Sequence, residues 1–195
     1  RDTDRSRGLG DVYKRQESDR VVFHKSIDNY AKDMMEFMLD RIYPHNYEDS
    51  MTIESGIRNG RKFIKSIVFN LEKKQFKNYE YSDYRINIKE KVIPLTKESV
   101  YTKKFKYEIL NVNDEKDFIR FDYAIHPIFP HMHINADENT WGNHLTYPDK
   151  TNLNLEKLDA IKAMNIFQKF VANPEFHILN QEDNGIYVSI IEGED

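Results

Sequence analysis

One stretch of the chain, residues 118–135, carries the side chains best suited to chemistry. Its sequence, FIRFDYAIHPIFPHMHIN, contains one arginine, one aspartate and three histidines. A guanidinium group binds oxyanions, and imidazoles move protons or bind metals near neutral pH. The two X-Pro steps, His126-Pro127 and Phe129-Pro130, predict a loop between two extended segments. Loop histidines and strand-borne polar groups can then meet at one site.

Arg120 and Asp122 lie in the segment FIRFDYA, residues 118–124, which reads as a strand. Because side chains alternate along a strand, both should point to the same face. Side chains two residues apart are separated by about 7 Å at Cβ, so these two can meet or share a third partner. A structural ion pair is the simpler interpretation, and a pair that positions a catalytic group is the other.

His131 and His133 form an H-x-H pattern in the segment HMHIN, which would place both imidazoles and Asn135 on one face of a short strand. This spacing is also used by β proteins that bind transition metals. A metal would need a third protein ligand, and the candidates are His126, Asp122, Asp137 and His144. We expect neither a cofactor nor a metal, but if a metal binds, its ligands should be His131, His133 and Asp122. Proton transfer, anion binding and plain packing are the other roles open to these histidines.

The metal-free chemistry that fits clustered histidines and arginine is phosphodiester cleavage. One histidine would take the ribose 2′-hydroxyl proton, a second would donate to the leaving oxygen, and Arg120 would stabilise the charge on the phosphorane. The chain has no glycine-rich phosphate loop, no GxSxG and no HExxH, so the usual signals for nucleotide-dependent enzymes, serine hydrolases and zincins are missing. The predicted catalytic residues are Arg120, Asp122, His126, His131 and His133.

Further residues near this stretch are candidates for substrate contact. They are Asn135, His144 and Trp141. Trp141, the one tryptophan, either stacks on a nucleobase or anchors its loop to the core.

The elements that must position these groups can be predicted from periodicity. Apolar residues recur every three or four positions from Val22 to Tyr43, which predicts a helix that Pro44 ends. Residues 51–74 admit a helix or a hairpin, and we favour the hairpin because Asn59-Gly60 matches a type I′ turn. Alternation predicts strands at 84–93, 103–112, 118–124 and 131–135, with a polar turn at 113–117.

The C-terminal third should contain a second helix. Its apolar face runs from Leu155 to Phe170, with Asn154 as the N-cap and Pro174 as the stop. The segment GIYVSIIEG, residues 185–193, reads as a last short strand. The predicted fold is therefore α+β, with a single antiparallel sheet of about five to six strands packed against an N-terminal and a C-terminal helix.

Composition limits the class of protein. Residues 1–16 lack apolar periodicity and resemble a sequencing-adapter read-through, so we predict a non-native leader at 1–16 and one α+β domain at 17–195. The chain has no cysteine and no apolar run long enough to span a bilayer, which favours a soluble, cytoplasmic protein. Its net charge of -4 disfavours a general polyanion-binding surface and leaves local basic strands to bind any nucleic acid.

The motifs from residue 103 to 171 resemble those of the TumE family of bacterial toxin-antitoxin proteins. The matching features are a tyrosine-rich strand with Tyr107, the run Arg120-Phe121-Asp122, and the proline-interrupted segment that contains His126, His131 and His133. The resemblance implies a toxin of a toxin-antitoxin or mobile-element system that acts on RNA and is neutralised by an antitoxin partner. Tyr107 thereby joins the predicted substrate-binding residues.

Two functions from different classes follow. The first is a toxin-like, metal-independent ribonuclease that uses the clustered histidines and arginine. The alternative is a non-catalytic protein-binding module of the immunity or antitoxin type, or an uncharacterised-family protein, in which the histidine loop is structural. The sequence does not predict an oligomeric state.

Overall fold

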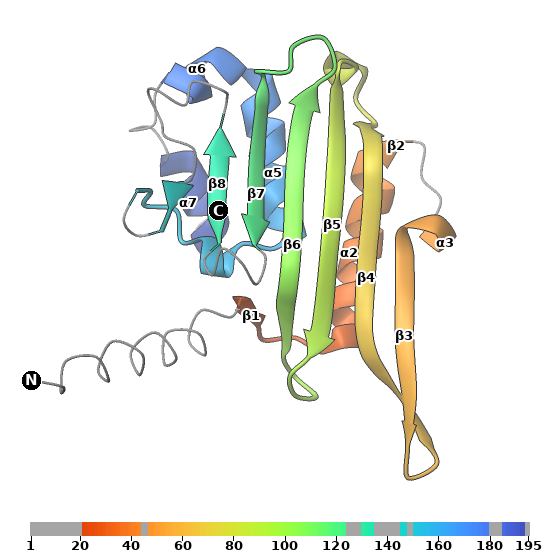
Figure 1. Cartoon of the computed structure of the whole chain (residues 1–195). Helices are drawn as coiled ribbons and strands as arrows, with labels where there is room; N and C mark the ends of the chain where they lie inside the picture. The colour runs from red at the N-terminus through yellow and green to blue at the C-terminus, as the bar shows by residue number, and fades with distance from the viewer. Residues whose placement is uncertain are drawn as a thin grey trace, which may run out of the picture.

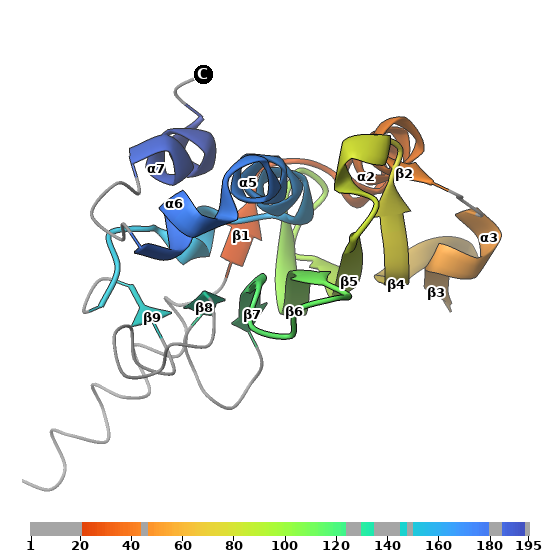
Figure 2. The same cartoon turned by 90° about the horizontal axis from the view of Figure 1, so that it is seen from above.

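The chain folds as one large antiparallel sheet with its helices on one side (Figures 1 and 2). The computed structural model describes residues 21–43, 47–123, 130–134, 145–147, 150–179 and 185–193. The two longest helices, α2 (Ile27–Arg41) and α5 (Ala160–Ala172), lie across the same face of the sheet. The predicted α+β class is confirmed, and the predicted leader lies outside the described residues.

The described residues form nine strands, more than the five to six predicted. They are β1 (Val21–Phe23), β2 (Ile42–Tyr43), β3 (Met51–Arg58), β4 (Arg61–Phe76), β5 (Tyr84–Pro94), β6 (Val100–Asn111), β7 (Phe118–Tyr123), β8 (His131–Ile134) and β9 (Leu145–Thr146). The order across the sheet is β2-β4-β5-β6-β7-β8-β9, with β3 paired to β4 and β1 paired to β6. Strands β1, β2 and β9 have only two or three residues, too few to leave an alternating pattern in the sequence.

The predicted hairpin at Asn59-Gly60 is confirmed. Both residues have positive φ, 51° and 73°, as a type I′ turn requires. The turn joins β3 to β4, and β4 continues for 16 residues, so the helical alternative for residues 51–74 is excluded. Strands β5 to β8 fall where alternation predicted them, within three residues at each end.

The N-terminal helix is shorter than predicted. Ser26 caps α2 by accepting a hydrogen bond from the Asn29 amide at 3.2 Å, and the helix ends at Arg41. The first residues of the predicted helix belong to β1 and the last to β2, because pairing with β6 and β4 satisfies their backbone groups instead.

The C-terminal region corrects three predictions. Asn154 makes no side-chain capping bond, and Asp159 instead caps α5 by accepting from the Lys162 amide. The predicted helix starts later than expected, since Leu155–Lys157 form a 3-10 turn (η2) and α5 begins at Ala160. It ends at Ala172, just before Pro174 as predicted, and Pro174 then starts a separate helix, α6 (Pro174–Leu179), where its missing amide proton costs nothing. The predicted strand at 185–193 is α7 (Gly185–Glu192). Its buried residues, Tyr187, Ile190 and Ile191, recur at helical spacing and α7 packs next to α5, so tertiary packing overrides the β propensity of this run.

The sheet has an apolar face and a polar face. On β5, Ile86, Ile88 and Val92 are buried on the face that α2 and α5 cover, whereas Asn87 and Lys89 alternate with them onto the opposite face. We call that opposite side the polar face. Among the described helices, none has the length and apolar character needed to span a bilayer.

Candidate functional site on the polar face

Two neighbouring strands bring the predicted site residues together. β7 pairs with β8 so that Arg120 lies opposite His133 and Asp122 lies opposite His131. The apolar residues that alternate with them, Ile119, Phe121 and Met132, are buried on the other face. The alternation that anchors β7 and β8 in the core therefore places four functional side chains side by side.

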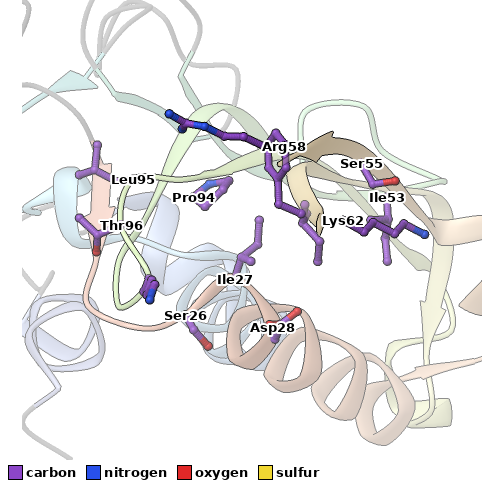
Figure 3. A pocket seen from close by; sticks show the side chains of 13 residues that line it. Ser26, Ile27, Asp28, Ile53, Ser55, Arg58, Lys62, Pro94, Leu95 and Thr96 are labelled. Carbon is purple, nitrogen blue, oxygen red and sulfur yellow. The ribbon is translucent and has the colours of Figure 1, made fainter. Parts of the chain in front are cut away.

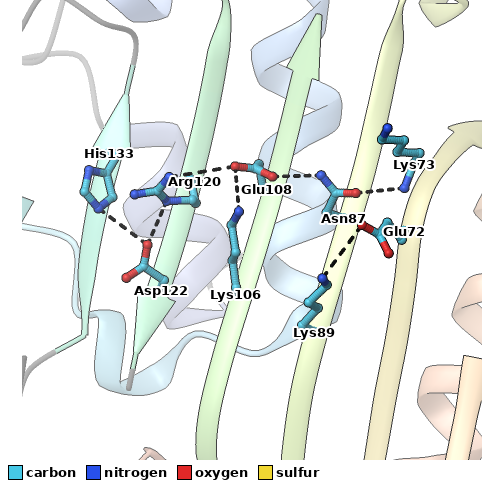
Figure 4. A network of polar contacts seen from close by, with 9 residues as sticks. All are labelled: Glu72, Lys73, Asn87, Lys89, Lys106, Glu108, Arg120, Asp122 and His133. Carbon is cyan, nitrogen blue, oxygen red and sulfur yellow. Dashed lines mark hydrogen bonds and ion pairs between the residues drawn. The ribbon is translucent and has the colours of Figure 1, made fainter. Parts of the chain in front are cut away.

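Asp122 is the centre of this cluster. Its Oδ2 accepts a hydrogen bond from Nε of Arg120 at 2.7 Å and lies 3.4 Å from Nε2 of His133. Its Oδ1 lies 2.6 Å from Nε2 of His131. The two imidazole rings are 5.0 Å apart and meet edge to face. The predicted convergence of Arg120, Asp122, His131 and His133 is thus a feature of the structure. Figure 4 shows Arg120, Asp122 and His133.

The neighbours of Asp122 determine its ionisation. Burial alone would raise the pKa of its carboxyl group, but hydrogen bonds from His131 and His133 and the charges of His131 and Arg120 together hold the pKa well below its ordinary value. Asp122 is therefore ionised at neutral pH. Because a carboxylate only accepts hydrogen bonds, the Nε2 atom of His131 carries the proton in this contact.

The cluster members differ in their access to solvent. The side chains of Arg120 and Asp122 are 28% and 22% exposed, whereas those of His131 and His133 are only 3% and 9% exposed. A ligand on the polar face would therefore meet the guanidinium and the carboxylate first. Asp122 would lie between such a ligand and the two imidazoles. His133 is the more exposed of the two.

A polar network extends the cluster across the sheet (Figure 4). Glu108 on β6 lies 3.9 Å from a terminal nitrogen of Arg120, 3.1 Å from Nζ of Lys106, and accepts a hydrogen bond from the Asn87 amide at 2.7 Å. These contacts follow the strand register, in which Glu108 is opposite Arg120 and also opposite Asn87. They hold the Arg120 guanidinium from a second side.

A groove of about 710 Å³ crosses the polar face beside the cluster. Its lining includes Arg120 and Asp122 at one end and extends to β3 through residues of β6, β5 and β4. Four cationic residues border it, namely Lys89, Lys104, Lys106 and Arg120. Although the whole chain is acidic, the groove lining holds four cations against two acids, Asp122 and the buried Glu90. Three of the cations also contact an acidic side chain, so the excess of positive charge that can attract an anionic ligand is small.

Asp122, His131 and His133 are also the described residues able to hold a metal. One donor atom from each can be chosen so that all three lie within 4.8 Å of one another. Ligands placed 2.0–2.2 Å from a tetrahedral zinc are about 3.3–3.6 Å apart, so the 2.6 Å contact between Asp122 and His131 would have to lengthen. The contact as it stands is a hydrogen bond, which favours a proton-linked cluster over a preformed metal site.

The other predicted site residues are placed differently. Tyr107 lies on the helix-covered face, is fully buried, and donates a hydrogen bond to Glu90 at 2.6 Å, so the structure does not bring it to the cluster. Four predicted residues lie outside the described residues: His126, Asn135, Trp141 and His144.

Sequence reasoning missed Glu108 and Lys89, and it recognised the basic stretch at 103–106 without placing Lys104 and Lys106 beside the cluster. The signal was available, because Lys104, Lys106 and Glu108 alternate with buried apolar residues in the segment that the 113–117 turn joins to β7. Counting back from the turn pairs Glu108 with Arg120 and Lys106 with Asp122.

Comparison with known proteins found no matching family model, no matching curated protein and no matching solved structure. The likeness of residues 103–171 to the TumE family accordingly stays a prediction from motifs.

Proposed function

We propose that this chain is a toxin-like protein of a bacterial toxin-antitoxin or mobile-element system that cleaves RNA without a metal. The observation that supports the proposal most strongly is the convergence of Arg120, Asp122, His131 and His133 at the end of a cationic groove. An imidazole can transfer the protons and an arginine can stabilise the phosphorane charge in phosphodiester transfer to a ribose 2′-hydroxyl, and this cluster contains both.

Each group has a role in this proposal. Arg120, held by Asp122 and Glu108, binds the scissile phosphate and stabilises the charge that develops on it. Asp122 stays ionised, fixes the His131 ring and lowers the cost of its positive charge. His133 lies 3.4 Å from Asp122 and is the more exposed imidazole, so it takes the proton of the 2′-hydroxyl and delivers it to the 5′-oxygen as the P–O5′ bond breaks.

The groove explains how an acidic protein can bind RNA. Lys89, Lys104 and Lys106 lie along it, so successive phosphates of one strand can meet successive cations on their way to Arg120. Binding of this kind should be local and strongly weakened by salt, because it depends on a few charges rather than on the net charge of the chain.

Growth of a bacterial host on induced expression of the chain tests the proposal. Wild type should arrest growth, whereas Arg120→Gln and His133→Gln should not. Arg85→Gln is the matched control, because Arg85 is on β5, two strands away from Arg120, and does not line the groove. It donates to the backbone carbonyls of Ser82 and Tyr84 and lies beside the Gln75 amide. Circular dichroism of each purified variant establishes that it is folded.

The burial of both imidazoles supports a second candidate, a non-catalytic protein-binding module. In that case the Asp122–His131 contact ties β8 to β7, and the cluster has a structural role. Growth that is the same for wild type, Arg120→Gln and Arg85→Gln, whether arrested or normal, would favour this candidate over the ribonuclease.

A further inference from the structure

The β3–β4 hairpin presents an unprotected edge. In the described part of the chain β3 pairs with β4 alone, and its other side continues no ladder (Figure 1). An eight-residue edge strand leaves about half of its backbone N–H and C=O groups directed outward, ready to pair with another strand. Two isoleucines on this edge are exposed, Ile53 at 49% and Ile57 at 79%.

A hollow of about 990 Å³ lies beside this edge, between the hairpin, the turn from β5 to β6 and the start of α2 (Figure 3). Its apolar lining comes from all three elements and consists of Ile27, Ile53, Phe63, Ile64, Pro94 and Leu95. Leu95 is 47% exposed and Phe63 is 43% exposed. Exposed apolar side chains that gather around a hollow mark a surface that another molecule can bury.

The rim of the hollow is cationic. Arg58, Lys62 and Lys97 line it together with a single acid, Asp28, and Arg61 adds a further charge at the hairpin turn. The first turn of α2 also faces it through Ser26 and Ile27 and adds the positive end of the helix dipole. Positive charge around an apolar floor complements a ligand that has both apolar and acidic side chains.

We propose that β3 docks a β-strand of a partner protein in which apolar and acidic side chains alternate. The partner strand extends the sheet at β3 and its apolar side chains fill the hollow. Its carboxylates alternate onto the opposite face, where the cross-strand pair Arg58 and Arg61 can bind them. A bulge between Glu54 and Ser55 divides β3 into two regular segments. The partner strand would pair in register with either segment but not across the bulge. A second copy of this chain is a poorer occupant, since it would bring its own hairpin cations against this cationic rim.

The proposal is independent of the catalytic cluster, which lies on the polar face at the other end of the sheet order. Its test uses the full chain and two synthetic probes: a fluorescein-labelled peptide of four Val-Glu repeats and its Val-Lys counterpart. Fluorescence anisotropy measures binding, and hydrogen exchange locates it. The Val-Glu peptide should bind at least about tenfold more tightly than the Val-Lys peptide, and it should slow amide exchange in β3.

Substitutions sharpen the test. Ile57→Lys should weaken binding of the Val-Glu peptide about tenfold, because it removes a large exposed apolar side chain next to the hollow. Val112→Lys is the control, since Val112 is also an exposed apolar side chain, at 50%, but follows the end of β6 and does not line the hollow. The double variant Arg58→Glu/Arg61→Glu should reverse the preference in favour of the Val-Lys peptide.

Any of four results would overturn the proposal. In the binding assay, these are equal binding of the two peptides, or no binding of either peptide up to about 1 mM, the weak limit expected for a short peptide. The others are slowed amide exchange that leaves β3 unprotected, or a concentration-dependent dimer, seen by light scattering, that Ile57→Lys dissociates. The last outcome would assign the edge to a second copy of the chain.

Discussion

The buried carboxyl group of Glu90 should make the stability of the protein depend on pH in an unusual direction. Glu90 is 3% exposed on the helix-covered face, where its Oε1 accepts hydrogen bonds from Tyr30 at 2.8 Å, Tyr107 at 2.6 Å and Thr102 at 3.1 Å. Burial raises the pKa of Glu90 to about 7, a rise that the three hydrogen bonds oppose and the nearby charge of Asp159 reinforces. Glu90 is thus protonated in the folded state at pH values where it is ionised in the unfolded chain.

The size of the effect on stability follows from the difference between the pKa of Glu90 in the folded and in the unfolded chain. A pKa that moves from 4.5 to about 7 on folding corresponds to about 3 kcal/mol. The folded state binds more protons than the unfolded state between these values, so the contribution of Glu90 to the free energy of unfolding decreases as pH rises. Between pH 5 and pH 8 the decrease should be about 2 to 3 kcal/mol.

Glu90→Gln removes this titration but keeps a side-chain oxygen that can accept from Tyr30 and Tyr107. Urea unfolding gives the free energy of unfolding of wild type and Glu90→Gln at pH 5 and at pH 8. From pH 5 to pH 8 this free energy should change in favour of the variant by about 2 to 3 kcal/mol relative to wild type. The exposed Glu98→Gln is the control and should give a profile parallel to wild type. A Glu90→Gln profile that is also parallel to wild type would refute the assignment of a raised pKa to this carboxyl group.

Two further substitutions test the site and the core by urea unfolding. Asp122→Asn should lower the free energy of unfolding by about 1 to 3 kcal/mol at pH 7, since it leaves buried imidazoles without a charged acceptor. Because folding lowers the pKa of the Asp122 carboxyl group, the stability difference between wild type and Asp122→Asn should shrink as pH falls below about 3.8. A stability difference that grows there would contradict the prediction. Phe167→Ala should cost about 3 to 5 kcal/mol, because the Phe167 ring is fully buried on α5 and stacks against Phe121, and a cost below about 1 kcal/mol would show that the core is packed differently.

Alternation and turn chemistry predicted the central part of the fold. Asn59-Gly60 allowed the hairpin to be recognised because few residues adopt positive φ, and β5 to β8 alternate regularly because one face is buried. The segment 185–193 was predicted wrongly, because a short apolar run rich in isoleucine and valine fits a strand and a buried helix equally well. Its packing beside α5 decides between them, and that contact joins residues distant in sequence.

The candidate site was predictable in part for the same reason. The period of two placed Arg120 and Asp122 on one face and His131 and His133 on another strand, and only the pairing register of β7 with β8 brings them into contact. Tyr107 alternates with Lys106 and Glu108 and shares a strand face with Phe105 and Ile109, so the pattern itself places it on the buried face. Only the motif resemblance made it a substrate-binding candidate. The groove required five strands, β3 to β7, to be aligned at once, which a linear pattern does not show.

The central claim is that Arg120 and its neighbours cleave RNA without a metal, and the products of an RNA digest test it most directly. Purified chain incubated with a labelled single-stranded RNA in excess EDTA should yield fragments that end in a 2′,3′-cyclic phosphate. Arg120→Gln should slow their appearance by at least about a hundredfold, and Arg85→Gln should not. Intact RNA, or cleavage that needs an added divalent metal and leaves 3′-hydroxyl ends, would contradict the account.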